Sequence, residues 1–321
     1  MGHDQPYPIT PLRDLDMGRL RTYSLRDRGG KVGLDHLASP QPGRGTMAHW
    51  LHSLPDTLAA ADLMSAARAV VSAREAGKGV LLGMGAHPVK VGLGPLIAGA
   101  VDEGIFTGIA TNGAAIIHDY ELALTGQTSE DVDAVLSEGR FGMAEETAVD
   151  LNGAISDGAR SGMGIGRAVG RLIAESGAPH SGVSVFAAAY RRPVPATVHV
   201  ALGTDVIHMH ASCDGAAVGQ ASLLDFHLLA RQVAALDGGV FINLGSAVII
   251  PEVFLKACSV AINLGWGLEG LTTVNMDFIQ HYRPRVNVLA RPPGSTGRGI
   301  SLTGHHELML PLLLAAVREL R

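Results

Sequence analysis

The stretch Gly104–Glu121, GIFTGIATNGAAIIHDYE, decides the predicted fold of this chain. Its first half is short, apolar and bounded by glycine, which is typical of a buried strand in a parallel sheet. The strand is expected to stop at Thr111-Asn112-Gly113, because Asn and Gly tolerate the backbone angles of a tight turn. A helix is predicted next, with His118, Asp119 and Glu121 in its first turns. Open α/β sheets bind ligands at the carboxyl ends of their strands, so this stretch is a candidate site. The alternative is a plain turn with a solvated helix face.

The same alternation of strand and helix continues along the chain. Four further short apolar stretches predict buried strands, at 78–84, 197–203, 240–244 and 271–278. Helical periodicity is found between and around them, at 46–76, 85–101, 122–190, 221–236, 251–264 and 308–320. Strands that alternate with helices predict an α/β fold with a doubly wound, mostly parallel, Rossmann-like sheet.

Two short motifs in the helical middle of the chain need separate interpretation. Gly126–Asp131 predicts a capped helix start, with Thr128 as the cap and Asp131 three residues on. The glycine-rich run Gly162–Gly170 resembles a dinucleotide-binding loop in composition. We do not interpret it so, because that motif requires a preceding strand and none is predicted there.

Composition narrows the class of protein. The 321 residues are 47% hydrophobic with a net charge of −5, so the chain is expected to bury a large core. No basic patch suggests a nucleic-acid or membrane partner. The longest apolar run, Leu308–Val317, contains Pro311 and is too short to span a bilayer. Cys213 and Cys258 lack metal or disulfide spacing, so we expect a cytoplasmic protein.

The first 45 residues differ from the rest in composition. They carry Pro, Gly and charge with little periodicity, and the segment Arg19–Lys31 is strongly basic. We expect residues 1–45 to form an arm and residues 46–321 a single α/β domain, which closes with a loop and helix at 291–321. The arm is interpreted either as a surface segment or as a contact in a homo-oligomer, most simply a dimer of dimers.

The predicted strand ends share a composition that suits a nucleotide. Each is followed by small or polar residues, and parallel strands place these ends along one edge of the sheet. Small residues let a ligand approach the backbone, helix N-termini favour phosphate, and carboxylates can accept ribose hydroxyls. The predicted cofactor-binding residues are Gly85, Ala86, Thr111, Asn112, Gly113, Asp205, Gly245, Ser246, Asn275 and Asp277.

Titratable residues near the same strand ends are candidates for catalysis. His87 and Lys90 are three apart on a predicted helix, and Lys90 could form a Schiff base or hold a carboxylate. His208 and His210 alternate, which predicts one face of an extended segment. The predicted catalytic residues are His87, Lys90, His118, Asp119, His208, His306 and Glu307. The histidine motifs could instead bind zinc or iron, but no metalloprotease-type spacing is present and no metal ligand is assigned.

Several of these motifs together resemble the deoxyhypusine synthase family, over about residues 50–290. Thr111-Asn112-Gly113-Ala114 resembles its Thr-Ala-Gly-Gly turn, with His118-Asp119 near its following acidic pair. Thr204-Asp205 matches its Thr-Asp-Gly strand end, Asn243–Val248 its triple-glycine strand end, and Asn275–Asp277 the last strand that touches the cofactor. The resemblance implies a tetrameric NAD-dependent enzyme of Rossmann-type fold, with active sites at the dimer interface.

One departure from that family bears on the reaction. The family forms an imine with the aminobutyl group on a Lys in a Ser-Trp-Gly-Lys segment near the C-terminus. This chain has no Lys after Lys256, and the matching region is Gly297–Glu307. The chain is therefore more similar to the bacterial and archaeal synthase-like branch. Gly85–Gly92 and Asn112–Glu121 also resemble the carboxyl-terminal domain of an ornithine cyclodeaminase branch, which uses NAD to oxidise an amine.

Three hypotheses remain open from the sequence. The first is an NAD-dependent enzyme that oxidises the C–N bond of an amine or amino acid, followed by transfer, elimination or cyclisation, but does not make deoxyhypusine. The second is a metal-assisted hydrolase that uses the histidine motifs. The third is a nucleotide-binding homologue without catalytic activity. Retained NAD, metal content and turnover on amines would separate them.

Overall fold

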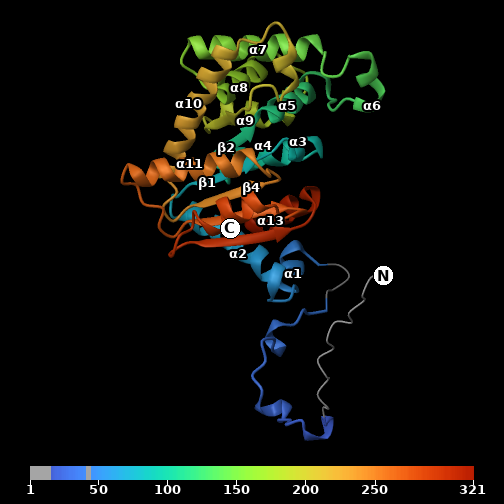
Figure 1. Ribbon diagram of the computed structural model, residues 1–321, viewed down its shortest axis with the longest axis vertical. Helices are drawn as coiled ribbons and strands as arrows, with labels where there is room; N and C mark the ends of the chain where they lie inside the picture. Colours follow the sequence, from blue (N-terminus) through green and yellow to red (C-terminus); the bar gives the residue numbers. More distant parts are fainter. Residues whose placement is uncertain (1–15, 41–44) are drawn as a thin grey trace, which may run out of the picture.

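A parallel sheet of six strands forms the centre of the computed structural model, which describes residues 16–40 and 45–321. The strands are β1 (Val80–Met84), β2 (Gly108–Asn112), β3 (Ala196–His199), β4 (Val240–Leu244), β5 (Thr272–Asp277) and β6 (Arg298–Thr303). They are hydrogen-bonded in the order β3-β2-β1-β4-β5-β6, and every pairing is parallel. This order confirms the predicted doubly wound, Rossmann-like α/β fold (Figure 1).

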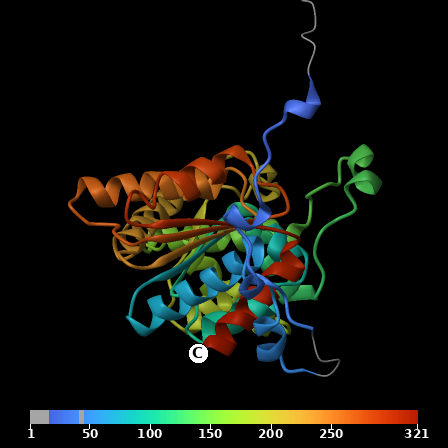
Figure 2. The same ribbon diagram turned by 90° about the horizontal axis from the view of Figure 1, so that it is seen from below.

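Helices cover both faces of the sheet, as parallel strands require. The longer ones are α2 (Leu58–Glu75), α4 (Gly94–Asp102), α5 (Gly113–Thr125), α7 (Glu145–Arg160), α8 (Ile165–Glu175), α9 (Val185–Arg191), α10 (Gly215–Ala234), α11 (Ile249–Asn263) and α13 (His306–Leu320). The shorter ones are α1 (Met47–His52), α3 (His87–Lys90), α6 (Val132–Val135), α12 (Tyr282–Pro284), and the π-helical turn η7 (Arg285–Ala290). Figure 2 shows α11 on one face of the sheet and α2 with α13 on the other.

Strand side chains alternate between two cores. From β1, Leu82 and Met84 enter the core shared with α2, α4 and α13, whereas Leu81 enters the core shared with α10 and α11. Gly83 faces the ring of Phe241, an atom of which would come within 2.7 Å of an added Cβ. The strands are thus buried on both sides, which explains their continuous apolar sequences. Beyond β3, helices α7, α8 and α9 form a further layer, at the top of Figure 1.

The structure differs from the sequence prediction in three segments. The strand predicted at 197–203 ends at His199, and Ala201 then accepts from the amide of Thr204 in a turn. The helix predicted at 46–76 is two helices, α1 and α2. His208 lies in a 3-10 turn, η6 (Val206–Met209), so the predicted extended segment with His210 is wrong.

Two further differences concern segments with weak local signals. Residues 291–299 were predicted as a loop, but β6 begins at Arg298. As the edge strand, β6 buries only Ile300 and Leu302, so its sequence carries little apolar signal. The predicted helix start at Gly126–Asp131 is real, but the cap of α6 is Asp131, which accepts from the amide of Ala134.

The remaining segments are simple. Residues 16–40 contain three short 3-10 turns, η1 (Met17–Arg19), η2 (Leu25–Asp27) and η3 (Leu34–His36), and are largely exposed. The backbone of this segment meets the following residues through a hydrogen bond from Asp56 to the carbonyl of His36. Within residues 16–40 and 45–321, no helix is long and apolar enough to cross a membrane.

Candidate functional site

The chain reverses direction across the sheet at β1, which makes the carboxyl edge there the topological switch point. From β1 the chain runs outward to β2 and β3, and it returns to β4 on the other side. The loops after β1 and β4 touch: a Cβ on Gly85 would lie 2.9 Å from the carbonyl oxygen of Gly245. Gly85 and Gly245 in turn donate their amides to Leu244 and Met276. Only glycine permits so close an approach, so the sequence fixes the shape of this crevice.

A chain of three side chains lies at this switch point. His87 and His306 share a hydrogen bond of 2.8 Å between their Nδ1 atoms. Nε2 of His306 lies 3.5 Å from Oδ1 of Asp277, which also accepts from the amide of Phe278 at 2.8 Å. His306 and Asp277 are buried, whereas His87 is exposed. The chain Asp277–His306–His87 therefore leads from the core to the surface.

The electrostatics of this chain depend on burial. Burial lowers the pKa of His87, and repulsion from His306 lowers it further. Burial alone would raise the pKa of Asp277. The hydrogen bond and charge of His306, together with two backbone amides, outweigh that effect, so the pKa of Asp277 is lowered. We therefore expect Asp277 to be ionised and His87 to be neutral near pH 7.

The ends of β4 and β5 are joined by an amide network. The side-chain amide of Asn243 donates to Oδ1 of Asn275 at 2.6 Å and to the carbonyl of Ser246 at 2.9 Å. Asn275 donates in turn to Gln280 at 2.7 Å. The hydroxyl of Ser246 accepts from the amide of Ile250 in the first turn of α11. The predicted residues Asn275 and Ser246 are thus at the edge, held rigidly by two residues that were not predicted.

The junction of β2 and α5 presents unpaired polar groups. The side chain of Asn112 precedes α5 but does not cap it, so no side chain accepts from the first amides of the helix there. Gly113 faces the carboxylate of Asp205, which would collide with any Cβ at that position. The N-terminus of α5 therefore has no side-chain cap, and the Asp205 carboxylate lies beside it.

A pocket of about 200 Å³ lies beside this junction. It is lined by residues of α3, of α5, of the segment 129–141 and of the loop after β3. Three predicted site residues, Lys90, His118 and Asp205, line it together with Glu121 and Glu130. The fold therefore brings together residues that are more than a hundred positions apart in sequence.

A hydrogen-bonded chain orients His118 in this pocket. The hydroxyl of Thr128 donates to Oε2 of Glu121 at 2.6 Å, so its oxygen can only accept from Nδ1 of His118, at 2.7 Å. Thr147 donates to the other oxygen of Glu121 at 3.1 Å. Nδ1 of His118 thus carries a proton and Nε2 a lone pair. Burial, aided by the charge of Lys90, lowers the pKa of His118 to about 4.

Several predicted catalytic residues lie elsewhere. Asp119 accepts from Ser184 and from the amides of Val185 and Phe186, so it anchors the start of α9 and does not reach the pocket. His208 accepts from the amides of Gly203 and Asp205 and so shapes the loop that carries Asp205. Glu307 is exposed and lies 3.9 Å from His305. Asp119 and His208 thus hold neighbouring backbone segments in place, and Glu307 does not line the pocket.

Buried polar atoms without a hydrogen-bond partner concentrate at the carboxyl edge. Four of them lie on or just beyond the strand ends: Thr111 Oγ1, Asn112 Oδ1, Asp205 Oδ2 and Asn243 Oδ1. A buried polar group without a partner costs about 1–3 kcal/mol, and native proteins contain few. Their grouping at one edge indicates that this edge binds a polar ligand or ordered water.

Sequence analysis named Glu121 beside His118 but missed the contributions of Thr128, Glu130, Asn243 and Gln280. Thr128 carried a recognisable signal, but as a helix cap. Nothing local shows that residues 126–142 fold back over α5, where the amide of Gly142 donates to Glu130 at 2.7 Å. Such contacts between distant segments leave no local sequence pattern.

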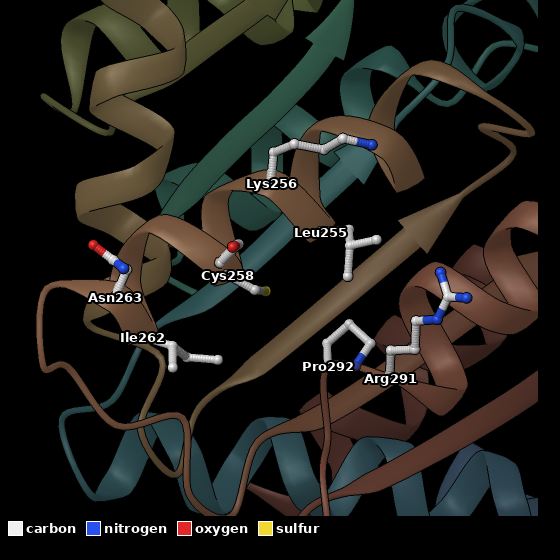
Figure 3. Close-up of a pocket in the computed structure, with 8 residues that line it drawn as sticks. Leu255, Lys256, Cys258, Ile262, Asn263, Arg291 and Pro292 are labelled. Carbon is white, nitrogen blue, oxygen red and sulfur yellow. The ribbon is translucent and has the colours of Figure 1, made fainter.

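A wider hollow, of about 560 Å³, lies away from this edge (Figure 3). It runs along α11 and is bordered on the other side by Arg291 and Pro292. Burial raises the pKa of Cys258, the one thiol that lines it, to about 12, so this thiol is not an activated nucleophile. None of the predicted site residues lines this hollow.

The histidine motifs do not combine into a metal centre within residues 16–40 and 45–321. No group of three or more His, Cys, Asp or Glu side chains there could hold a metal ion. Nε2 of His210 lies 2.8 Å from the carbonyl of Gly142, and Nδ1 of His208 is occupied by backbone amides. The structure therefore gives no support to a metal-assisted hydrolase.

No protein-family model and no curated protein sequence matches this chain. Among solved structures, AgrE in its ternary complex with ornithine and NAD+ aligns with a TM-score of 0.53 at 15% identity, over 80% of this chain and 33% of AgrE. Unliganded AgrE aligns with a TM-score of 0.53 at 17% identity, over 81% of this chain and 32% of AgrE. This chain thus spans about a third of AgrE's length.

A provisionally assigned deoxyhypusine synthase from Entamoeba histolytica aligns along almost its whole length. Its TM-score is 0.50 at 13% identity, over 85% of this chain and 93% of that one. At such low identity these alignments establish the fold and not the activity. The resemblance that Thr111–Ala114 and the other strand-end motifs predicted is confirmed at that level: the chain has the fold of the deoxyhypusine synthase-like structures.

Proposed function

We propose that this chain binds NAD at the carboxyl edge of the sheet and acts on the C–N bond of an amine or amino acid. The observation that carries the proposal is the group of unpartnered buried polar atoms at that edge, in a sheet whose strand order is that of dinucleotide-binding folds. The co-crystallisation of AgrE with ornithine and NAD+ adds support from a protein of similar fold.

The residues at the edge fit a dinucleotide in chemistry and shape. The open N-terminus of α5 supplies free amides for a phosphate, and Gly113-Ala114-Ala115 lets it approach the backbone. Gly85 and Gly245 narrow the crevice between β1 and β4, where Asn243 offers an unpaired oxygen. Nine of the ten predicted cofactor contacts are retained in the proposal. For Asp277, which is paired with His306, we propose a supporting role.

The proposed chemistry requires a base close to the substrate nitrogen. When bound, the cofactor supplies an acceptor for the hydride of the carbon atom that carries this nitrogen. His118 can take the accompanying proton, because it is neutral at pH 7 and its Nε2 lone pair is free. The surrounding pocket is lined by α5 and the segment 129–141, which would hold the substrate nitrogen close to His118.

Thr111 and Thr273 provide a matched test of cofactor placement. Both hydroxyls are buried and unpartnered, but Thr111 lies at the carboxyl end of β2, whereas Thr273 lies near the amino end of β5. We expect Thr111→Val to weaken NAD+ binding about two- to tenfold, the loss of one hydrogen bond of about 0.5–1.5 kcal/mol. Thr273→Val should leave binding unchanged. Isothermal titration calorimetry with NAD+ measures both.

The outcomes separate the hypotheses. Absence of NAD+ binding by the wild-type protein at millimolar concentration would contradict the proposal. Equal affinities in both variants would contradict the placement. Binding without reduction of NAD+ in the presence of any amine or amino acid would favour a nucleotide-binding protein without catalytic activity. Absorbance of reduced nicotinamide near its characteristic band reports turnover, with ornithine as the first substrate to test.

A further inference from the structure

The pocket beside α5 differs from the crevice between β1 and β4 in size and charge. Its volume of about 200 Å³ is below the range of roughly 300–1,000 Å³ typical of drug-sized ligands. It is therefore too small for a dinucleotide and suits a molecule with about ten heavy atoms. Its lining combines one cation, Lys90, with carboxylates and one neutral imidazole, His118.

Asp205 is the carboxylate of this pocket that lacks a hydrogen bond. Its side chain is 6% exposed, and Oδ2 has no hydrogen-bond partner. The nearest titratable side chain is His208, whose Nε2 lies 4.0 Å from Oδ2. Burial raises the pKa of Asp205, and the charge of His208 opposes this. A ligand ammonium would supply both the missing hydrogen bond and the missing charge.

The other two carboxylates of the pocket already accept hydrogen bonds. Glu121 accepts from Thr128 and Thr147, and Glu130 accepts from the amide of Gly142. Of the three carboxylates, only Asp205 has a buried oxygen without a hydrogen-bond partner. Lys90 lines the pocket from α3. It forms no salt bridge among the described residues. It is free to pair with a ligand anion.

We infer that this pocket binds the zwitterionic end of an α-amino acid, with its ammonium on Asp205, its carboxylate on Lys90, and His118 Nε2 as the acceptor of an ammonium proton. The inference deepens the proposed function, on which it rests, and moves Asp205 from cofactor binding to substrate binding. An unpaired carboxylate and an unpaired ammonium in one small pocket select a ligand that carries both charges. A polyamine lacks the carboxylate and would leave Lys90 without a partner. The ammonium groups of the polyamine would also lie close to the ammonium of Lys90.

The test measures binding without turnover, so that it does not depend on the redox step. The probes are L-ornithine, L-norvaline and putrescine, of which putrescine has the carbon chain of ornithine without its carboxylate. Each is titrated calorimetrically into the full chain, with and without saturating NAD+. We expect both amino acids to bind at least about tenfold more tightly than putrescine.

The variants assign the preference to the two charges. Lys90→Gln should reduce the ratio of ornithine to putrescine affinity to less than about threefold, because the exposed Lys90 acts only on the carboxylate. Lys78→Gln, at the opposite end of β1, is the matched control and should leave the ratio unchanged. Asp205→Asn keeps the shape of the side chain and should weaken all three probes at least tenfold, with NAD+ affinity unchanged.

Three results would overturn the inference. They are failure of every α-amino acid in a panel of the twenty common ones and ornithine to bind, a putrescine affinity equal to that of ornithine, or a preference that persists in Lys90→Gln. Amino-acid binding with the expected variant effects but without NAD+ binding would uphold the pocket and contradict the proposed function. Weaker NAD+ binding in Asp205→Asn, without an effect on amino acids, would return Asp205 to the cofactor.

Discussion

His87 and His306 lie 219 residues apart in sequence and share a hydrogen bond of 2.8 Å between their Nδ1 atoms. Such a bond needs one donor and one acceptor, so a single proton lies between the two Nδ1 atoms. The ring of His306 occupies the space where a side chain at position 245 would begin, and Gly245 has the positive φ of 66° that glycine favours. The first and last segments of the domain are therefore joined at the switch point.

The pair makes a direct prediction about His87. Repulsion from His306 contributes to the lowered pKa of His87, so His306→Gln should raise that pKa. The variant should also lose about 1–3 kcal/mol of stability, because Asp277 is left buried without its partner. NMR titration of the His87 ring and urea unfolding measure the two effects. His305→Gln, which changes the exposed neighbour, is the control, and an unchanged His87 pKa in His306→Gln would contradict the assignment.

A buried carboxylate in α10, Asp225, should decrease stability as pH rises from about 4 to 7, against the opposite contributions of His118 and His199, whose pKa values burial lowers to about 4. Asp225 accepts from the amides of Gly166 and Val198 and so joins the start of α8 to β3. Burial outweighs these hydrogen bonds and raises the pKa of Asp225 to about 7. The folded state therefore holds a proton that the unfolded state releases, and the free energy of unfolding decreases as pH rises from the unfolded value to the folded one.

Asp225→Asn isolates this effect. The variant has no proton to lose at this position, so between pH 4 and 7 its unfolding free energy should change in the positive direction relative to that of the wild type, by on the order of 2 kcal/mol over the interval. Urea unfolding at several pH values gives the slopes. Asp119, whose pKa burial raises to about 6, adds a smaller slope of the same sign in both proteins. Identical slopes in the two proteins would contradict the prediction.

The orientation of His118 should depend on Thr128. Thr128→Val removes the acceptor of the Nδ1 proton and the donor to Glu121 but keeps the volume of the side chain. We expect a mixture of His118 tautomers, a decrease in kcat of about tenfold or more, and little change in KM. Thr128→Ser, which restores the hydroxyl, should recover both the tautomer and kcat. Nitrogen chemical shifts of the His118 ring report the tautomer independently of activity.

Assembly is a separate prediction. Within residues 16–40, seven apolar side chains are more than half exposed, namely Met17, Leu20, Tyr23, Leu25, Val32, Leu34 and Leu37. An arm of this kind is suited to burial against a second copy of the chain, which supports the expected homotetramer. Light scattering at micromolar protein should give a mass of about four chains, and removal of residues 1–40 should reduce it. A monomer for the full chain would contradict the prediction.

Local sequence predicted the parts of the fold that depend on local physics. The apolar run of β4 gave its exact bounds, since a strand buried on both faces needs a continuous apolar sequence. The edge strand β6, in which only Ile300 and Leu302 are buried, carried no such signal. The residues of the site were recognisable as strand ends, but their partners were not. Whether Asp119 points toward the pocket or toward α9 depends on where Ser184 folds, which no local pattern encodes.

The final prediction is that this chain does not transfer an aminobutyl group from spermidine to the translation factor that deoxyhypusine synthases modify. That transfer requires an amine nucleophile to hold the group as an imine, and Lys256 is the last Lys of the chain. The region that would carry the missing Lys, Gly297–Glu307, forms β6 and the start of α13. In this region the imidazole of His306 lies at the carboxyl edge of the sheet, paired with His87 and Asp277. Arg298 cannot replace the Lys, because its guanidinium stays protonated and is bound to Asp62 at 3.1 Å.

Incubation with labelled spermidine, NAD+ and the factor should leave the factor unlabelled, while an authentic synthase labels it under the same conditions. Borohydride reduction with an amine substrate should likewise leave no adduct in the peptides after Lys256, and a labelled factor would contradict the prediction outright.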